Sequence, residues 1–124
     1  MKDILDELIS MSGLSPSNKV EYANVYFREL DDTEMAINIL SDLQNKYIKM
    51  ENMVKIKGFS KGSVSTARWN RWQKAFPDIV SSLVYIYKST NRYLEAEDVL
   101  VNWISRFPND NNAKKLLEEV RSQD

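Results

Sequence analysis

The chain of 124 residues contains no cysteine and no histidine, which excludes disulfide scaffolds, thiolate chemistry and histidine-based acid–base catalysis. Apolar residues make up 43% and charged residues 28%, a balance that suits neither a disordered nor a membrane-spanning chain. The sequence has only three glycines and three prolines, and this scarcity of turn formers argues against a many-stranded β fold. The composition therefore predicts an all-α protein whose helices are joined by tight turns.

Apolar residues at helical spacing predict a short N-terminal helix within residues 1–12 and a first helical pair over residues 16–50. Ser15 precedes a proline at the expected beginning of this pair. Serine followed by proline favours a helix start, because serine caps free amides and proline has no amide hydrogen to leave unpaired. Asp31 and Asp32 mark the turn between the two helices, since their side chains can cap the helix that follows.

A basic insertion over residues 52–77 is expected to follow the first pair. The glycines of its KGFSKGS stretch mark a loop, and the helix after this loop is expected to end before Pro77. A second helical pair with an additional capping helix is predicted over residues 78–122. We expect all of these elements to form a single domain over residues 1–124.

The two helical pairs repeat one another weakly, at an offset of 60 residues. The equivalent positions are Phe27 and Tyr87, Ala36 and Ala96, Leu40 and Leu100, and Leu43 and Trp103. In a helical hairpin a small residue lets the second helix approach the first, and an aromatic residue fills the space beside it. The offset therefore indicates a repeated hairpin that the basic insertion interrupts.

Residues 79–120 resemble a tetratricopeptide repeat followed by the extra helix that is usual in that family. The residues that carry the resemblance are Leu83, Tyr87, the NRYLEA turn that ends in Ala96, Leu100, Phe107 and Pro108. Residues 19–52 resemble the repeat more loosely, since Ile48 stands where the family usually has proline. The resemblance implies an all-α fold of about six helices, arranged as antiparallel hairpins.

The resemblance also implies that a protein or peptide binds the surface formed by the first helix of each pair. The candidate partner-binding residues on that surface and on the last helix are Glu21, Arg28, Ser81, Tyr85, Lys88, Asn112 and Lys115. The alternative is that these positions are ordinary solvent-facing residues. On the resemblance, we expect a non-catalytic protein–protein interaction module, an adaptor or assembly factor.

The basic insertion allows a second interpretation. Its basic residues are Lys55, Lys57, Lys61, Arg68, Arg71 and Lys74, and it contains no acidic residue. Clustered positive charge is what nucleic acid or an acidic protein partner requires. The same charges would also arise where a basic face pairs with acidic residues of its own fold.

The stretch GFSKGSVSTA also resembles the turn and recognition helix of lactose-repressor-type helix-turn-helix proteins, through Gly58, Ser60 and Val64. This resemblance implies that Arg68 lies near a DNA groove and that Arg71 meets phosphates. Nucleic-acid binding through the basic insertion is therefore the alternative function.

Two tryptophans in the insertion have two interpretations. Trp69 and Trp72 alternate with arginines, as they would in a surface that stacks on nucleic-acid bases. Their helical spacing with Phe76 instead places the three rings on one face, which favours burial in the core.

The chain lacks the usual catalytic motifs, with no G-x-S-x-G and no phosphate-binding glycine loop, so we expect no enzymatic activity and no cofactor. Asp31, Asp32 and Glu34 could bind a hard cation, but helix capping explains them more simply, and no metal site is assigned. The first residues do not form a secretory signal, and no window approaches the ~20 apolar residues that cross a bilayer. We therefore expect a cytoplasmic protein without membrane contact, and homo-oligomerisation through exposed aromatic residues is left open.

Overall fold

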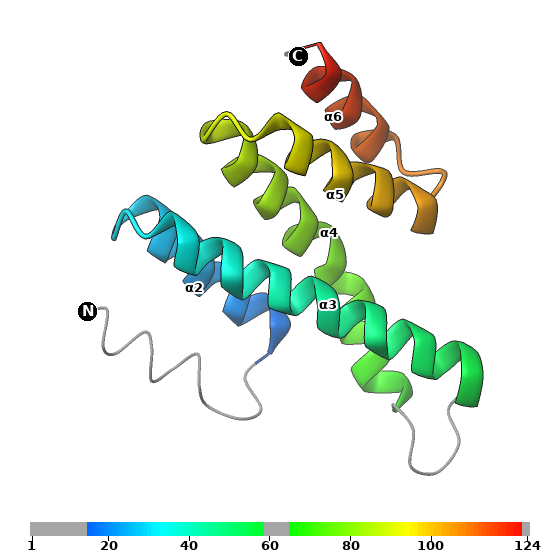
Figure 1. The fold of residues 1–124 in the computed structure, drawn as a ribbon. Coiled ribbons are helices and arrows are strands. Elements are labelled where there is room, and N and C mark those ends of the chain that lie inside the picture. The colour runs from blue at the N-terminus through cyan, green and yellow to red at the C-terminus, as the bar shows by residue number, and fades with distance from the viewer. Residues whose placement is uncertain (1–14, 59–64, 123–124) are drawn as a thin grey trace. The chain divides into compact units, whose positions relative to one another are not determined.

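The computed structural model describes residues 15–58 and 65–122, and over these residues the chain forms five α-helices and no strand (Figure 1). The helices are α2 (Pro16–Arg28), α3 (Thr33–Lys57), α4 (Thr66–Ser89), α5 (Tyr93–Arg106) and α6 (Asn111–Arg121). The predicted all-α class is thus confirmed for the described part of the chain. The helix expected within residues 1–12, and the turn of the helix-turn-helix resemblance, lie outside the described residues.

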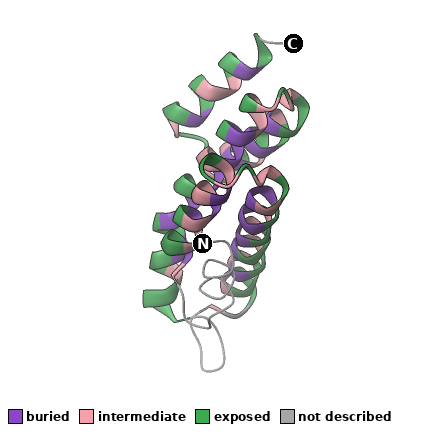
Figure 2. Ribbon diagram, turned by 90° about the vertical axis from the view of Figure 1, so that its left-hand side faces the viewer, coloured by how far each residue is buried: buried purple, intermediate pink, exposed green. Residues whose placement is uncertain are grey.

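Two compact units make up the chain, one ending at Ile79 and the other beginning at Val80. The first unit contains α2, α3 and the first part of α4, and the second contains the rest of α4 with α5 and α6. Buried and exposed residues alternate along each described helix, so that each has a buried face and a face in contact with solvent (Figure 2). The single domain expected over residues 1–124 stays a prediction.

In the first unit α2 packs against α3, and local caps determine where each helix begins. The Ser15 hydroxyl accepts a hydrogen bond from the Asn18 amide at 3.2 Å, and the Asp32 carboxylate accepts one from the Met35 amide at 3.2 Å. Both caps satisfy amides that a helix start would otherwise leave unpaired, as the sequence predicts. The buried core of the two helices includes Val20, Ala23, Tyr26, Ala36, Leu40 and Leu43.

A stack of three aromatic rings joins α3 to the first part of α4. The centroid of the Tyr47 ring lies 4.2 Å from that of Phe76 and 5.3 Å from that of Trp69, with interplanar angles of 26° and 21°. Trp72 and Phe76 are buried and Trp69 is half-buried, which confirms the core placement that their spacing predicts. The stack therefore holds the first part of α4 against α3.

The helix expected to end before Pro77 continues through it, because α4 runs unbroken from Thr66 to Ser89; the predicted boundary is wrong. A proline inside a helix removes one backbone hydrogen bond and disfavours the helix by about 3 kcal/mol. The neighbouring side chains of Phe76 and Ile79 are fully buried, and burying side chains of this size contributes about 1.5–3 kcal/mol each. Tertiary packing therefore overrides the local signal.

α3 continues past residue 50, where the first hairpin is expected to end, as far as Lys57. Gly58 ends it with a φ of 64°, a backbone conformation that glycine adopts without steric penalty. Residues 51–57 contain neither glycine nor proline, so no helix breaker stops α3 earlier. The basic insertion expected over residues 52–77 is therefore divided between the end of α3 and the beginning of α4.

In the second unit α5 packs against α6. The Asp110 carboxylate caps α6 by accepting a hydrogen bond from the Ala113 amide at 3.2 Å. The ion pairs that reach α6 are Lys88–Glu119 at 3.4 Å and Arg121–Glu97 at 3.3 Å. Because such partly exposed pairs contribute at most about 1 kcal/mol each, burial is the main source of stability here. The buried residues include Leu83, Ala96, Leu100, Trp103, Ala113 and Val120.

The turns that precede α3 and α5 have the same backbone conformation, at the offset of 60 residues found in the sequence. Asp31 and Asn91 have positive φ angles of 52° and 60°, a region that Asp and Asn tolerate better than most residues. The residues that follow, Asp32 and Arg92, have φ/ψ angles of −102°/74° and −98°/66°. The fully buried residues at equivalent positions after these turns are Ala36 and Ala96, and Leu40 and Leu100. The two helical pairs thus repeat each other at their turns.

Candidate anion-binding site

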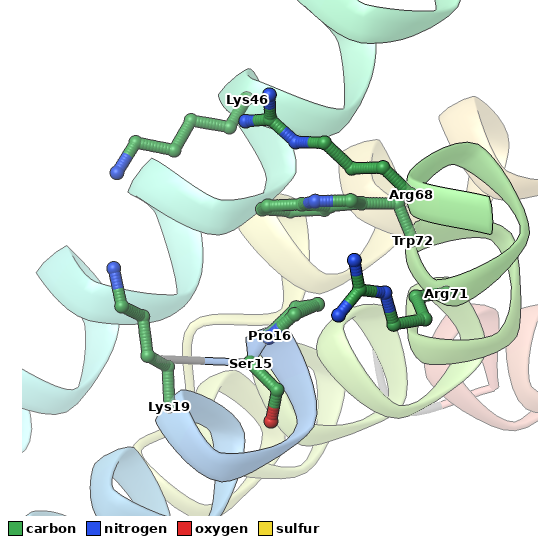
Figure 3. A pocket seen from close by; sticks show the side chains of 7 residues that line it. All are labelled: Ser15, Pro16, Lys19, Lys46, Arg68, Arg71 and Trp72. Atoms are coloured by element: carbon green, nitrogen blue, oxygen red, sulfur yellow. The ribbon is translucent and has the colours of Figure 1, made fainter. Parts of the chain in front are cut away.

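A pocket with a volume of about 410 Å³ lies in the first unit, and three helices contribute to its wall (Figure 3). Its lining residues are Ser15, Pro16, Lys19, Lys46, Arg68, Arg71 and Trp72. They come from the beginning of α2, the middle of α3 and the beginning of α4. Four of these side chains are cationic and none is acidic, so the pocket attracts anions. We call it the anion-binding site.

The beginning of α4 supplies the two arginines and the tryptophan of the site. The Ser65 hydroxyl accepts a hydrogen bond from the Arg68 amide at 3.2 Å and fixes the first turn of the helix. Arg71 and Trp72 lie three and four residues later, on the same helical face as Arg68. In Figure 3 the Trp72 ring is seen edge-on, with Arg68 on one side and Arg71 on the other. Trp72 is only 8% exposed.

The lysines of the site come from α2 and α3, across the pocket from the arginines (Figure 3). Lys19 lies one turn after the Ser15 cap, and its amide donates a hydrogen bond to the Ser15 carbonyl at 3.2 Å. Lys46 precedes Tyr47, whose ring stack holds α3 against α4. The core therefore determines how far the lysines lie from the arginines.

The positive charges of the site repel one another. Burial lowers the pKa of the Lys19 ammonium, the Lys46 ammonium lowers this pKa further, and the Asp42 carboxylate raises it. Asp42 does not line the pocket, but its carboxylate pairs with the Lys46 ammonium at 3.1 Å. The amino end of α2 adds positive potential, since its first turn contains no acidic residue. An anion in the pocket would relieve this repulsion.

Sequence reasoning found part of the site. Arg68 and Arg71 were predicted as contacts for an acidic partner or nucleic acid, and both line the pocket. Lys74, predicted with them, is exposed on α4 but does not line the pocket. Lys19 and Lys46 were missed, because nothing in their spacing along the chain shows that they meet the arginines. Two features of the sequence lie beside the missed lysines. The predicted Ser15 cap lies one turn before Lys19, and Tyr47, an aromatic residue in the apolar stripe of its helix, directly follows Lys46.

Among the other predicted basic residues, the structure describes the side chains of Lys55 and Lys74, and neither lines this pocket. Lys55 is exposed on α3, and its ammonium pairs with the Glu51 carboxylate at 3.6 Å, which is the internal pairing that the sequence left open. Lys61 lies outside the described residues, and only the backbone of Lys57 is described. Of the basic side chains of 52–77 that the structure describes, Arg68 and Arg71 line the pocket.

The candidate partner-binding residues lie on helices of both units. Glu21, Arg28, Tyr85, Asn112 and Lys115 are exposed, and Ser81 and Lys88 are half-buried. The Lys88 ammonium pairs with the Glu119 carboxylate at 3.4 Å, so part of its charge is neutralised within its own unit. A shared binding surface for these residues stays a prediction.

The acidic turn before α3 serves as a helix cap. The Asp32 carboxylate accepts a hydrogen bond from the Met35 amide, as the capping interpretation predicts. Within residues 15–58 and 65–122, no cluster of three or more acidic side chains is arranged to hold a metal ion.

None of the described helices is both long enough and apolar enough to cross a membrane.

Comparisons with protein-family models, with curated proteins and with solved structures gave no match to this chain. The functional argument therefore rests on the geometry and the charge of the site itself.

Proposed function

We propose that the chain is a non-catalytic protein-interaction module that holds an acidic segment of another protein in the anion-binding site. The observation that carries this proposal is the presence of four cationic side chains, from three helices, and of no acidic side chain among the described residues that line one pocket. Arginine guanidinium groups bind carboxylates through paired hydrogen bonds. The ring stack around Tyr47 holds α3 against α4, so the site is formed before a partner arrives, which reduces the entropy lost on binding.

Two observations favour an acidic protein segment over nucleic acid. Arg68 and Arg71 lie on the two sides of the nearly buried Trp72 ring, so this ring offers little surface on which a base could stack. The chain as a whole has a net charge of −1, whereas nucleic-acid binding depends on extended positive potential. Nucleic-acid binding through residues 52–77, in a helix-turn-helix-like arrangement, is the alternative function.

The proposal includes a tetratricopeptide-like hairpin for each helical pair. Its support is the repeated turn at Asp31 and Asn91 and the buried alanine near the beginning of each following helix. Hairpins of this kind present helical surfaces to protein partners. In this proposal Tyr85 of the second unit, which is 56% exposed, also contacts the protein partner. The cytoplasmic location expected from the sequence also belongs to this proposal.

Fluorescence anisotropy with a labelled peptide of alternating glutamate and glycine tests the proposal. A glutamine–glycine peptide with the same label measures binding that does not depend on charge, and labelled single-stranded and duplex DNA test the alternative function. We expect the glutamate peptide to bind more tightly than the other three probes. Its affinity should fall between roughly 50 and 200 mM salt, because the pairs formed are partly exposed to solvent.

A double variant connects the binding to the site. In Arg68→Gln/Arg71→Gln we expect the Kd for the glutamate peptide to rise at least about tenfold. The matched control is Lys74→Gln/Lys114→Gln, which removes the same charge from exposed residues that do not line the pocket. Equal losses in both variants would show that net charge, and not this site, binds the peptide. Tighter binding to DNA than to the glutamate peptide would replace the proposal with the alternative function.

A further inference from the structure

We infer that the anion-binding site takes a phosphate monoester, so that phosphorylation of a serine in the acidic segment of the partner strengthens its binding. This inference deepens the proposed function and rests on it. It concerns which anion the site prefers, whereas the proposed function requires only that an acidic segment binds.

The number of cations in the site exceeds what one carboxylate can satisfy. A carboxylate has one negative charge and two oxygen atoms, whereas a phosphate monoester carries about −1.5 to −2 charges at neutral pH and three acceptor oxygens. Four cationic side chains line the pocket, and the Asp42 carboxylate pairs with only one of them, Lys46. A phosphate monoester would therefore neutralise more of the remaining charge than a glutamate side chain.

The cations of the site also lie in several directions around the pocket and do not share one edge. In Figure 3 the Trp72 ring lies between Arg68 and Arg71, and the ammonium groups of Lys19 and Lys46 lie to the left of both arginines. A planar carboxylate presents its two oxygens on one edge and suits one guanidinium fork. The three oxygens of a phosphate monoester point in three directions, so this group can accept hydrogen bonds from donors that do not share one edge.

The size of the pocket fits a single modified side chain. Its volume of about 410 Å³ lies near the lower end of the range of about 300–1,000 Å³ for small-ligand sites. A phosphorylated serine could enter it together with several water molecules, whereas the folded surface of a protein could not enter. The amino end of α2, with Ser15 and Pro16 in the pocket wall and no acid in its first turn, adds a positive dipole end of the kind that favours phosphate.

Three labelled peptides test the inference directly. They share one glutamate–glycine sequence and differ only at the central position, which is serine, glutamate or phosphoserine. We expect the phosphoserine peptide to bind the full chain at least about tenfold more tightly than the glutamate peptide, and the serine peptide to bind most weakly. Inorganic phosphate should displace the phosphoserine peptide at lower concentration than acetate does.

Variants of the site decide whether the preference belongs to this pocket. In Arg68→Gln/Arg71→Gln the difference between the phosphoserine and glutamate peptides should disappear, and in Lys74→Gln/Lys114→Gln it should persist. Lys19→Met/Lys46→Met provides a second test from the other wall, should the arginine variant fail to fold by circular dichroism. Persistence of the full difference in both site variants would overturn the assignment.

The outcomes separate this inference from the proposed function. Equal affinities for the phosphoserine and glutamate peptides, with both lost in the site variants, would overturn the inference and leave the proposed function in place. Failure of all three peptides to bind would overturn both. Displacement by phosphate and acetate at equal concentrations would also contradict the inference, because the site would then respond to charge and not to phosphate.

Discussion

Replacement of Tyr47 by leucine tests whether the aromatic stack holds the first unit together. Tyr47 is 1% exposed, and its ring stacks on both Trp69 and Phe76 of α4. Tyr47→Leu keeps an apolar side chain but removes both ring contacts. Because Lys46 is the neighbouring residue and the arginines of the site belong to α4, the same change should also weaken the anion-binding site.

The expected loss of stability follows from the two ring pairs. Aromatic pairs contribute about 0.5–1.5 kcal/mol each beyond the burial of their area, so the loss of two pairs costs about 1–3 kcal/mol. Leucine is smaller than tyrosine and leaves part of the space unfilled, which adds about 1 kcal/mol if the site relaxes partially. We therefore expect Tyr47→Leu to lower the free energy of unfolding by about 2–4 kcal/mol.

Urea denaturation followed by circular dichroism measures this change, with anisotropy of the labelled glutamate peptide as the second readout. The matched control is Tyr47→Phe, which keeps both ring contacts and loses only the hydroxyl; we expect it to remain within about 1.5 kcal/mol of the parent chain. The reasoning would be refuted if the leucine and phenylalanine variants unfolded at the same urea concentration, since the ring contacts would then contribute nothing measurable.

Four further substitutions test other parts of the structure by urea denaturation. Pro77→Ala should raise the free energy of unfolding by about 1–3 kcal/mol, because it restores a helical amide; a loss would show that α4 requires the proline. Ala36→Leu and Ala96→Leu should each lower it by about 1–3 kcal/mol through overpacking, since both alanines are fully buried; an unchanged curve for either would reject the repeated hairpin. Lys19→Met should raise the unfolding midpoint and weaken peptide binding, because burial and Lys46 lower the pKa of Lys19. Since its charged form is disfavoured in the folded state, the advantage of methionine should shrink as the pH rises toward the ordinary lysine pKa of 10.5; a constant advantage would contradict this reasoning.

The parts of the fold that the sequence predicts correctly depend on neighbouring residues. The caps at Ser15 and Asp32 join a side chain to an amide three residues later. The residues next to each helix start are therefore sufficient to predict the cap. The turns at Asp31 and Asn91 were also predicted from local residues, and the structure adds that both residues have positive φ angles. The wrong boundary at Pro77 arises because the local cost of a proline in a helix is offset by burial of side chains that the local rule does not consider.

The anion-binding site could be predicted only in part, because it is a long-range feature. Arg68 and Arg71 were found because they lie close together in a basic segment. Lys19 and Lys46 belong to two other helices, and each is an ordinary helical lysine when read along the chain. Only the packing of α2 and α4 on α3 brings the four cations to one pocket, and that packing depends on contacts such as the stack of Tyr47 with α4, which no spacing rule contains.

The second helices of the two pairs end differently around the position of Ile48. At the offset of 60 residues the counterparts of Tyr47 and Ile48 are Phe107 and Pro108. A proline disfavours the helical conformation of the residue before it, and Phe107 has φ/ψ angles of −130°/75° where α5 ends. With isoleucine in place of proline, α3 continues through Tyr47 to Lys57, so the Tyr47 ring stays on a regular helix and meets α4. The helix that contains Tyr47 and Lys46 thus continues past the position at which α5 ends, and Tyr47 contacts α4 from this helix.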